Sequence, residues 1–232
     1  MMTIPATLFP VEQIFMETQQ KQCRSICITA CDTGDGVTSV ATALTERFLL
    51  AGYSTLLVDL NLNNPAFHNS ALVHKTNDEL THWIEHHKTH HIYTGVTVPN
   101  QTGSLIAYRD PDFLKNNLNK WLATYDRIVI DTSPILHATN DNIPANTVAL
   151  SCDAALLVVR TGHNTSSQLA QASAYLDNDQ IQLLGTILNT YQQPSLGQEM
   201  VRELKRIPFV PTRWRKKLNH YLLNSPLLNS LA

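Results

Sequence analysis

A short glycine-containing loop between a predicted strand and a predicted helix constrains this chain more than any other feature. The loop spans residues 31–39 (CDTGDGVTS), after a β-rich run at 25–29 and before a helical pattern at about 38–51. Glycines let such a loop curl so that its backbone N–H groups and the N-terminus of the next helix face an anion. The order of strand, loop and helix therefore predicts a phosphate-binding loop.

Four residues of the loop fit that chemistry directly. Gly34 and Gly36 are the positions where the backbone can adopt conformations closed to other residues. Thr38 stands where a hydroxyl would coordinate Mg²⁺, and Ser39 follows it. We therefore assign all four to a nucleotide-binding site, with Thr38 also as a metal ligand.

Two other loop residues do not fit it. Val37 occupies the position where loops of this kind carry a lysine, and Asp35 adds negative charge where phosphates would lie. Both are assigned to the same site, which we expect to be vestigial. The sequence predicts a site that keeps its shape and lacks its principal cation.

Two aspartates follow predicted strands of the same sheet. Asp59 ends the apolar run 54–59, and Asp131 ends the run 127–131. Carboxylates at the carboxyl ends of adjacent strands, beside a phosphate loop, are the ligands that a Mg²⁺–nucleotide needs. The alternative is that both aspartates only cap the loops that follow them.

Alternating strands and helices predict the fold class: α/β, with a doubly wound, mostly parallel sheet and helices on both faces. We divide the chain into an N-terminal lead and helix (1–24), a main domain (25–207) and a basic amphipathic tail (208–232). The expected strands are 25–29, 54–59, 104–107, 127–131, 154–160 and 181–188, and the expected helices 11–22, 38–51, 78–87, 110–125, 166–176 and 199–206.

Composition excludes some functions. A formal net charge of −2 gives no sign of a general nucleic-acid binder, so none is expected as a partner. No apolar run reaches the roughly 18 residues of a membrane span, so we expect a cytoplasmic protein. The four cysteines (Cys23, Cys27, Cys31 and Cys152) are expected to be buried free thiols.

The histidine-rich run 86–91 (HHKTHH) has two interpretations. Pairs of histidines can bind zinc. No cysteine pair accompanies the run, and only Glu85 adjoins it. An exposed polar loop is therefore favoured over a metal site.

The tail carries seven cationic residues between 202 and 217, against one acid, Glu203. Its apolar side chains share one helical face. Such a helix could lie on an anionic membrane or a partner, or could pack on its own domain, and the sequence leaves these open. The residues assigned to docking are Arg213, Trp214, Lys216, Lys217, Leu218, Tyr221 and Leu222.

Several segments together resemble one family. Residues 28–41 resemble the deviant Walker A loop of the bacterial tyrosine kinases (BY-kinases), which are relatives of the MinD/ParA ATPases. Asn189, at the end of the run 185–189 (GTILN), matches an asparagine that lies near the adenine in that family. The resemblance implies a P-loop NTPase fold over about residues 10–195. The other matching segments are 58–65 (VDLNLNNP), 125–134 (YDRIVIDTSP) and 153–160 (DAALLVVR).

The chain departs from the family where phosphoryl transfer occurs. Besides the missing lysine, Asn61 replaces the second carboxylate of the family's Asp-x-Asp pair. The tyrosine-rich tail is missing, since Tyr221 is the only tyrosine after Tyr191, and the arginines of the family's oligomer motif are missing near 12–18. We therefore expect a pseudo-enzyme, with Asp59 and Asp131 as its only candidate catalytic residues.

The resemblance implies a regulatory or scaffold subunit in bacterial surface-polysaccharide biosynthesis or export. Its implied partners are a membrane polysaccharide co-polymerase, a second copy of the chain and the inner-membrane surface. Its implied cofactor is ATP or ADP with Mg²⁺, which the fold does not require. Two alternatives stay open: a slow ATPase or tyrosine kinase whose missing charge comes from Arg24 or a partner, and a MinD-like positioning protein.

Overall fold

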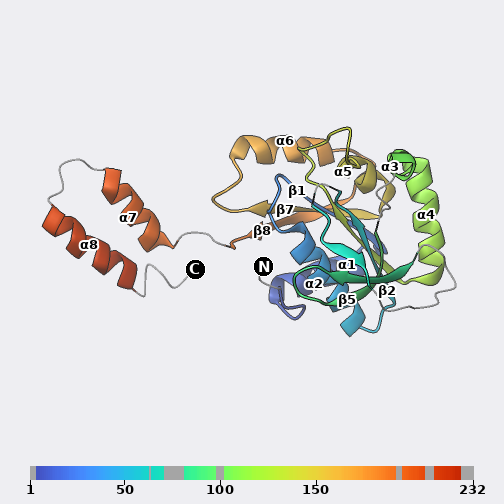
Figure 1. Ribbon diagram of the computed structural model, residues 1–232, viewed down its shortest axis with the longest axis horizontal. Coiled ribbons are helices and arrows are strands. Elements are labelled where there is room, and N and C mark those ends of the chain that lie inside the picture. The colour runs from blue at the N-terminus through green and yellow to red at the C-terminus, as the bar shows by residue number, and fades with distance from the viewer. Residues whose placement is uncertain are drawn as a thin grey trace. The chain divides into compact units, whose positions relative to one another are not determined.

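The computed structural model describes residues 4–62, 64–70, 81–97, 102–191, 195–206 and 212–225. The chain forms two compact units, and we describe each by itself. The first unit comprises Met1–Val159 and Asn164–Ile187, and the second comprises Arg160–His163 and Leu188–Ala232. Figure 1 labels most of the elements of both.

An eight-stranded sheet in the order β3-β4-β5-β2-β6-β1-β7-β8 organises the fold. The pairs β1–β6, β1–β7, β2–β5 and β2–β6 are parallel, whereas β3–β4 and β4–β5 are antiparallel. The sheet is therefore mostly parallel, as predicted. The strands are β1 (Ser25–Ala30), β2 (Thr55–Leu60), β3 (Phe67–Asn69), β4 (His82–His86), β5 (Ile92–Thr97), β6 (Arg127–Thr132), β7 (Ala154–Arg160) and β8 (Leu183–Asn189).

Helices cover both faces of the sheet, so the doubly wound α/β prediction is confirmed. Side chains of α1 and α2 form one apolar cluster with the sheet, and those of α4, α5 and α6 form a second cluster. Figure 1 shows α1 and α2 on one side of the sheet and α5 and α6 on the other. The helices of this unit are α1 (Phe9–Gln20), α2 (Val37–Leu50), α3 (Thr102–Tyr108), α4 (Pro111–Thr124), α5 (Ala145–Ser151) and α6 (Ser166–Leu176).

The continuous apolar runs of the central strands explain this burial. Every residue of β1 and β2 is buried, as expected for parallel strands covered on both faces. Alternate side chains enter opposite clusters: Ile26 and Ile28 contact the α1–α2 side, and Cys27 the α4–α6 side. All four cysteines are free and buried, as predicted. Burial raises the pKa of the Cys27 thiol to about 12, which keeps that sulfur protonated.

The edge of the sheet beyond β5 corrects two predictions. The helix expected at 78–87 is wrong, because residues 82–86 form β4, while 71–80 lie outside the described residues. The strand expected at 104–107 is also wrong, because α3 occupies it. Pairing with β5 dictates the conformation of β4, where the side chain of Ile84 alone is both apolar and fully buried. Neither β3 nor α5 was predicted from the sequence.

The second unit contains two packed helices, α7 (Leu196–Arg206) and α8 (Thr212–Asn224). The described part of the tail, residues 212–225, is therefore mostly helical, as its pattern indicated. Leu222 is buried, whereas Leu218 and Tyr221 are 43% and 69% exposed, so these three residues do not share one exposed face. Among the described residues, no helix is both long and apolar enough to cross a membrane.

Gly95 in β5 provides a test of the packing at the sheet edge. A Cβ at this position would collide with the Ile84 side chain and with the carbonyl oxygen of Leu57, a backbone atom that cannot move aside cheaply. We expect Gly95→Ala to lower the free energy of unfolding by about 1–3 kcal/mol. Urea denaturation would measure this, with Thr94→Ala as the neighbouring control. A Gly95→Ala protein as stable as that control would contradict the packing of β4 on β5.

Candidate functional site: a phosphate-binding loop with two buried carboxylates

The loop between β1 and α2 has the backbone of an anion-binding site. Gly34 and Gly36 have φ values of +81° and +110°, in the left-handed region that favours glycine. Gly36 is the N-cap of α2, and no side chain caps the helix there. The first N–H groups of α2 have no partners within the helix, so they are available to an anion. Ser39 is half-buried on this first turn.

Thr38 and Asp131 meet behind the loop. The Thr38 hydroxyl donates a hydrogen bond of 2.6 Å to Asp131 Oδ2, joining the first turn of α2 to β6. Asp131 is completely buried, and its Oδ1 has no hydrogen-bond partner among the described residues. A buried, unpartnered carboxylate oxygen beside a hydroxyl fits a divalent cation. The sequence placed these two residues together correctly.

Asp59 lies opposite Asp131 in the register of β2 and β6 and also caps the loop after β2. Its Oδ1 accepts the N–H of Asn61 at 3.0 Å. Its Oδ2 accepts the N–H groups of Ala66 at 3.0 Å and Phe67 at 3.3 Å. Asp59 therefore makes the contacts expected if it only caps the loop that follows β2. It also lies beside Asp131, as the metal hypothesis requires.

Burial of this pair favours protonated carboxyls. Desolvation raises the pKa of Asp59 to about 6, against the bonds from the backbone N–H groups that lower it. Desolvation raises the pKa of Asp131 well above its usual range, and the negative charge of Asp59 raises it further. Two buried acids without a cation therefore retain protons that a bound cation would displace.

Asn61, in the place of a second family carboxylate, is part of the same network. The Ser133 hydroxyl donates to its side-chain oxygen at 3.3 Å, and the polar Asn61 side chain opposes the rise in the pKa of Asp131. Asn61 is buried. The substitution thus puts a neutral amide, with no negative charge to offer a metal, inside the site.

The two atypical loop residues are both buried. Val37 is 6% exposed and belongs to the apolar cluster of α1, α2 and the sheet. Asp35 is fully buried; its Oδ2 accepts the Asp32 N–H at 2.8 Å and the Asn164 amide at 3.0 Å. The carboxylate of Asp35 is thus bonded within the protein and stabilises the loop. The role of Asn164 had no signal in the sequence.

Arg24 does not supply the missing cation. Its guanidinium donates to the carbonyl oxygens of Leu122, Tyr125 and Asp126, at the C-terminal end of α4. Arg24 precedes β1, whereas the loop follows β1, so the two lie at opposite ends of that strand. The hypothesis that Arg24 completes the site is wrong for this physical reason.

His137 is a loop neighbour that the sequence analysis missed. Its Nε2 lies 3.0 Å from Asp32 Oδ1. It follows β6 in a segment with no recognisable motif, so only the pairing of β1 with β6 brings it to the loop. Asn189 belongs to the second unit, where its Oδ1 accepts the N–H of Tyr191 at 3.0 Å; its role near an adenine stays a prediction.

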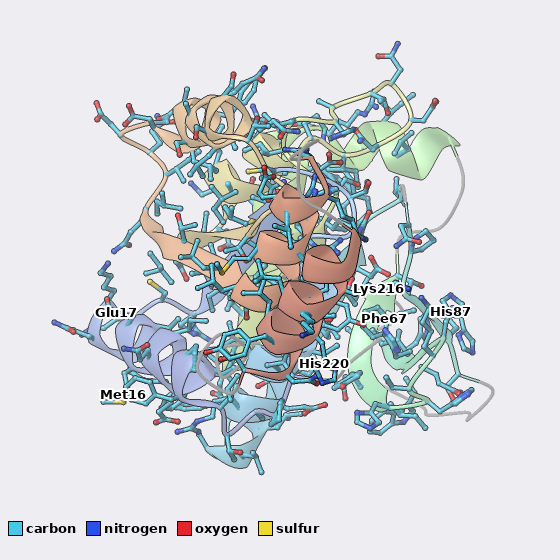
Figure 2. All side chains as sticks on the ribbon, turned by 90° about the vertical axis from the view of Figure 1, so that its left-hand side faces the viewer. Met16, Glu17, Phe67, His87, Lys216 and His220 are labelled. Carbon is cyan, nitrogen blue, oxygen red and sulfur yellow. The ribbon has the colours of Figure 1, made fainter. Side chains whose placement is uncertain are left out.

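The histidine-rich run closes the β4–β5 turn. The run was expected to be an exposed loop. His86 departs from this expectation, because it is buried and its Nδ1 accepts the Thr89 N–H at 3.1 Å. His90 lies 2.7 Å from Glu85, and His87 stacks on His68. Figure 2 shows His87 at the periphery of the molecule. Within the described ranges, no three His, Cys, Asp or Glu residues are grouped to hold a metal ion.

The docking residues on α8 are described in part. Lys216, Lys217, Leu218 and Tyr221 are exposed, and Figure 2 shows Lys216 on this helix. The side chains of Arg213 and Trp214 lie outside the described part of the chain. A binding role for this surface stays a prediction.

The buried acids give a testable pH dependence. In the unfolded chain Asp59 loses its proton near its ordinary pKa, whereas in the folded protein it keeps the proton up to about pH 6. Between these two pKa values the folded protein binds more protons than the unfolded chain, so the free energy of unfolding falls as the pH rises. A shift of about two pKa units corresponds to about 3 kcal/mol. The free energy of unfolding should fall between pH 4 and pH 7, and we expect this fall to be smaller by about that amount in Asp59→Asn than in the unmodified protein. Urea denaturation at each pH would measure the difference.

Asp126 provides a control of opposite sign. Hydrogen bonds from the Ser54 hydroxyl and N–H lower its pKa, so its contribution is present above its ordinary pKa and is lost on acidification. Asp126→Asn should therefore reduce stability at neutral pH more than at low pH. If the free energy of unfolding changes with pH equally in Asp59→Asn and in the unmodified protein, the buried pair of acids is contradicted.

Comparison with known proteins identifies relatives of this chain and solved structures with a similar fold. The chain is 27% identical over 180 residues to the tyrosine-protein kinase YwqD of Bacillus subtilis, covering 73% of each protein. The kinase domain of the Escherichia coli tyrosine kinase ETK has the same fold, with a TM-score of 0.56 and 20% identity over 78% of this chain and 72% of that one. MinD of Pyrococcus horikoshii complexed with Mg-ADP has a TM-score of 0.53 and 19% identity, over 84% of this chain and 76% of that one.

The family is also shown directly. A family model described as an AAA domain matches residues 24–212, which includes the loop, both aspartates and most of the sheet. With bacterial tyrosine kinases as its relatives and MinD among its structural neighbours, the chain belongs to this AAA-domain family of P-loop proteins.

Proposed function

We propose that this protein is a nucleotide-binding regulatory or scaffold subunit of bacterial surface-polysaccharide machinery, with little or no phosphoryl transfer of its own. One observation carries the proposal: Val37 is buried in the apolar cluster at the lysine position, beside an intact Thr38–Asp131 pair. The loop thus keeps the geometry that binds phosphate and lacks the positive charge that phosphoryl transfer requires. The tyrosine-kinase relatives support the resemblance to the bacterial tyrosine kinases, and that resemblance implies the pathway and the polysaccharide co-polymerase as partner.

Binding relies on groups that the chain retains. The loop N–H groups at 34–39 and the N-terminus of α2 would hold phosphate oxygens. Thr38 and Asp131 would hold Mg²⁺, with Asp59 beside them. Bound Mg²⁺ neutralises phosphate charge. These residues therefore fit ATP or ADP with Mg²⁺, the ligand that their arrangement favours.

Catalysis requires groups that the chain lacks. Phosphoryl transfer depends on preorganised positive charge around the transferring group, and losing one such donor costs about 3–4 kcal/mol. Asn61 also removes one carboxylate from the metal site. A slow ATPase or kinase would need a partner's cation, and turnover abolished by Asp131→Ala would favour that alternative.

Restoring the lysine tests the proposal. Val37 begins α2, so Val37→Lys can cover the same apolar surface with its stem and extend its ammonium group to the loop opening. We expect about a tenfold gain in ATP affinity by calorimetric titration with Mg²⁺, from one charge-assisted hydrogen bond.

The matched control is Val37→Met, which adds length without charge and should leave the affinity unchanged. If Val37→Lys folds and binds ATP no more tightly than Val37→Met, the loop is not a phosphate site. Absence of nucleotide binding by the unmodified protein at millimolar concentration would refute the proposal itself.

The α7–α8 unit is proposed to dock the protein on an anionic surface. Exposed Leu218 and Tyr221 adjoin exposed Lys216 and Lys217, an arrangement typical of a helix at a membrane interface. The inner-membrane surface is one candidate and an acidic segment of the co-polymerase is the other.

Charge reversal distinguishes docking from a packed tail. We expect the double variant Lys216→Glu and Lys217→Glu to lose at least tenfold in binding to anionic phosphatidylglycerol vesicles, at about 1 kcal/mol for each lysine. Lys115→Glu with Lys120→Glu, which changes two exposed lysines of α4, is the matched control. Binding only to the co-polymerase segment would assign the surface to that partner, and binding to neither would refute docking.

A further inference from the structure

His137 lies beside the phosphate-binding loop. Its Nε2 is 3.0 Å from Asp32 Oδ1, and the two side chains are 44% and 24% exposed. Asp32 Oδ1 also accepts the N–H of Thr33 at 2.6 Å, so the carboxylate is fixed to the loop backbone. The imidazole is therefore held at the solvent-accessible side of the loop.

The segment that carries His137 is firmly anchored. The Arg109 guanidinium donates to the Asn142 carbonyl oxygen at 2.7 and 2.9 Å and to the Thr139 carbonyl oxygen at 2.8 Å. The Asn142 amide donates to the His137 carbonyl oxygen at 2.6 Å. At the other end, the Ile135 N–H bonds to the carbonyl oxygen of Ala30, the last residue of β1. The position of His137 relative to the loop is thus set by four backbone anchors.

The charged groups on the elements next to the His137 segment are mainly acidic. On the loop side they are Asp32 and the buried Asp35, and at the ends of the neighbouring strands they are Asp59 and Asp131. Its own segment contributes Asp141. Arg109 directs its guanidinium to backbone carbonyls of that segment, so it stabilises the segment.

We infer that His137 is a nucleotide-binding residue, which supplies in its protonated form the positive charge that Val37 removes from the loop. This inference rests on the proposed nucleotide binding and adds a pH dependence to it. Histidine is the side chain that changes charge between pH 5 and pH 8. A loop lysine gives a constant charge, whereas this site binds phosphate more tightly as the pH falls.

The test compares variants at equal pH, so that titration of ATP itself cancels. We expect His137→Gln to weaken binding of ATP, measured by calorimetry with EDTA in place of Mg²⁺, by about tenfold at pH 6 and by less than twofold at pH 8. Omitting Mg²⁺ removes metal binding from the measurement, so protonation of Asp59 and Asp131 cannot act on ATP affinity through the metal site. His137→Lys should bind ATP about as tightly as the unmodified protein at pH 6 and more tightly than the unmodified protein at pH 8.

Two further variants complete the design. His82→Gln changes an exposed histidine of β4, outside the loop, and should bind like the unmodified protein at both pH values. Asp32→Asn removes the competing carboxylate and should strengthen binding. An equal loss for His137→Gln at pH 6 and pH 8 would show a purely structural role and overturn the inference. Failure of the unmodified protein to bind ATP at either pH would instead overturn the proposed function.

Discussion

The hydrogen bond from Thr38 to Asp131 joins the elements on which the rest of the site depends. It links the first turn of α2 to β6, and β6 is the neighbour of β1, from which the loop emerges. In a parallel sheet the carboxyl ends of such strands share one edge, so the loop, both aspartates and His137 converge there. Chain segments about 100 residues apart thus form one site because two strands pair.

Much of this arrangement follows from sequence alone. Continuous apolar runs such as 154–160 identify buried parallel strands, because each side of such a strand contacts a helix layer. The acids at their ends could be predicted to meet for the same reason. The pattern failed at the sheet edge: β4 is a short strand with one deeply buried apolar residue, Ile84, and its conformation depends on pairing that no local periodicity encodes.

The site details that escaped prediction are those set by tertiary contacts. Asp35 looked like a negative charge facing phosphates, yet its Oδ2 accepts hydrogen bonds from a loop N–H and from Asn164, which is 129 residues away. Arg24 looked like a free cation, yet its guanidinium caps the C-terminal end of α4. In both cases the charge of the residue was evident from the sequence, whereas the hydrogen-bond partners of the charged group were not.

The charge balance of the site explains why binding and catalysis can separate. The backbone N–H groups of the loop and the unpartnered oxygen of Asp131 persist, since they depend on the fold and not on the residue at position 37. Transfer of a phosphoryl group requires fixed positive charge at the reacting oxygens, which a buried Val37 cannot give. A cation from His137 would be present only when that ring is protonated, while acidic conditions also protonate Asp59 and Asp131 and weaken the metal site. The proposed cation and the proposed metal site therefore have opposite pH dependences, and this opposition is the charge argument behind the proposal that the protein binds a nucleotide with little or no turnover.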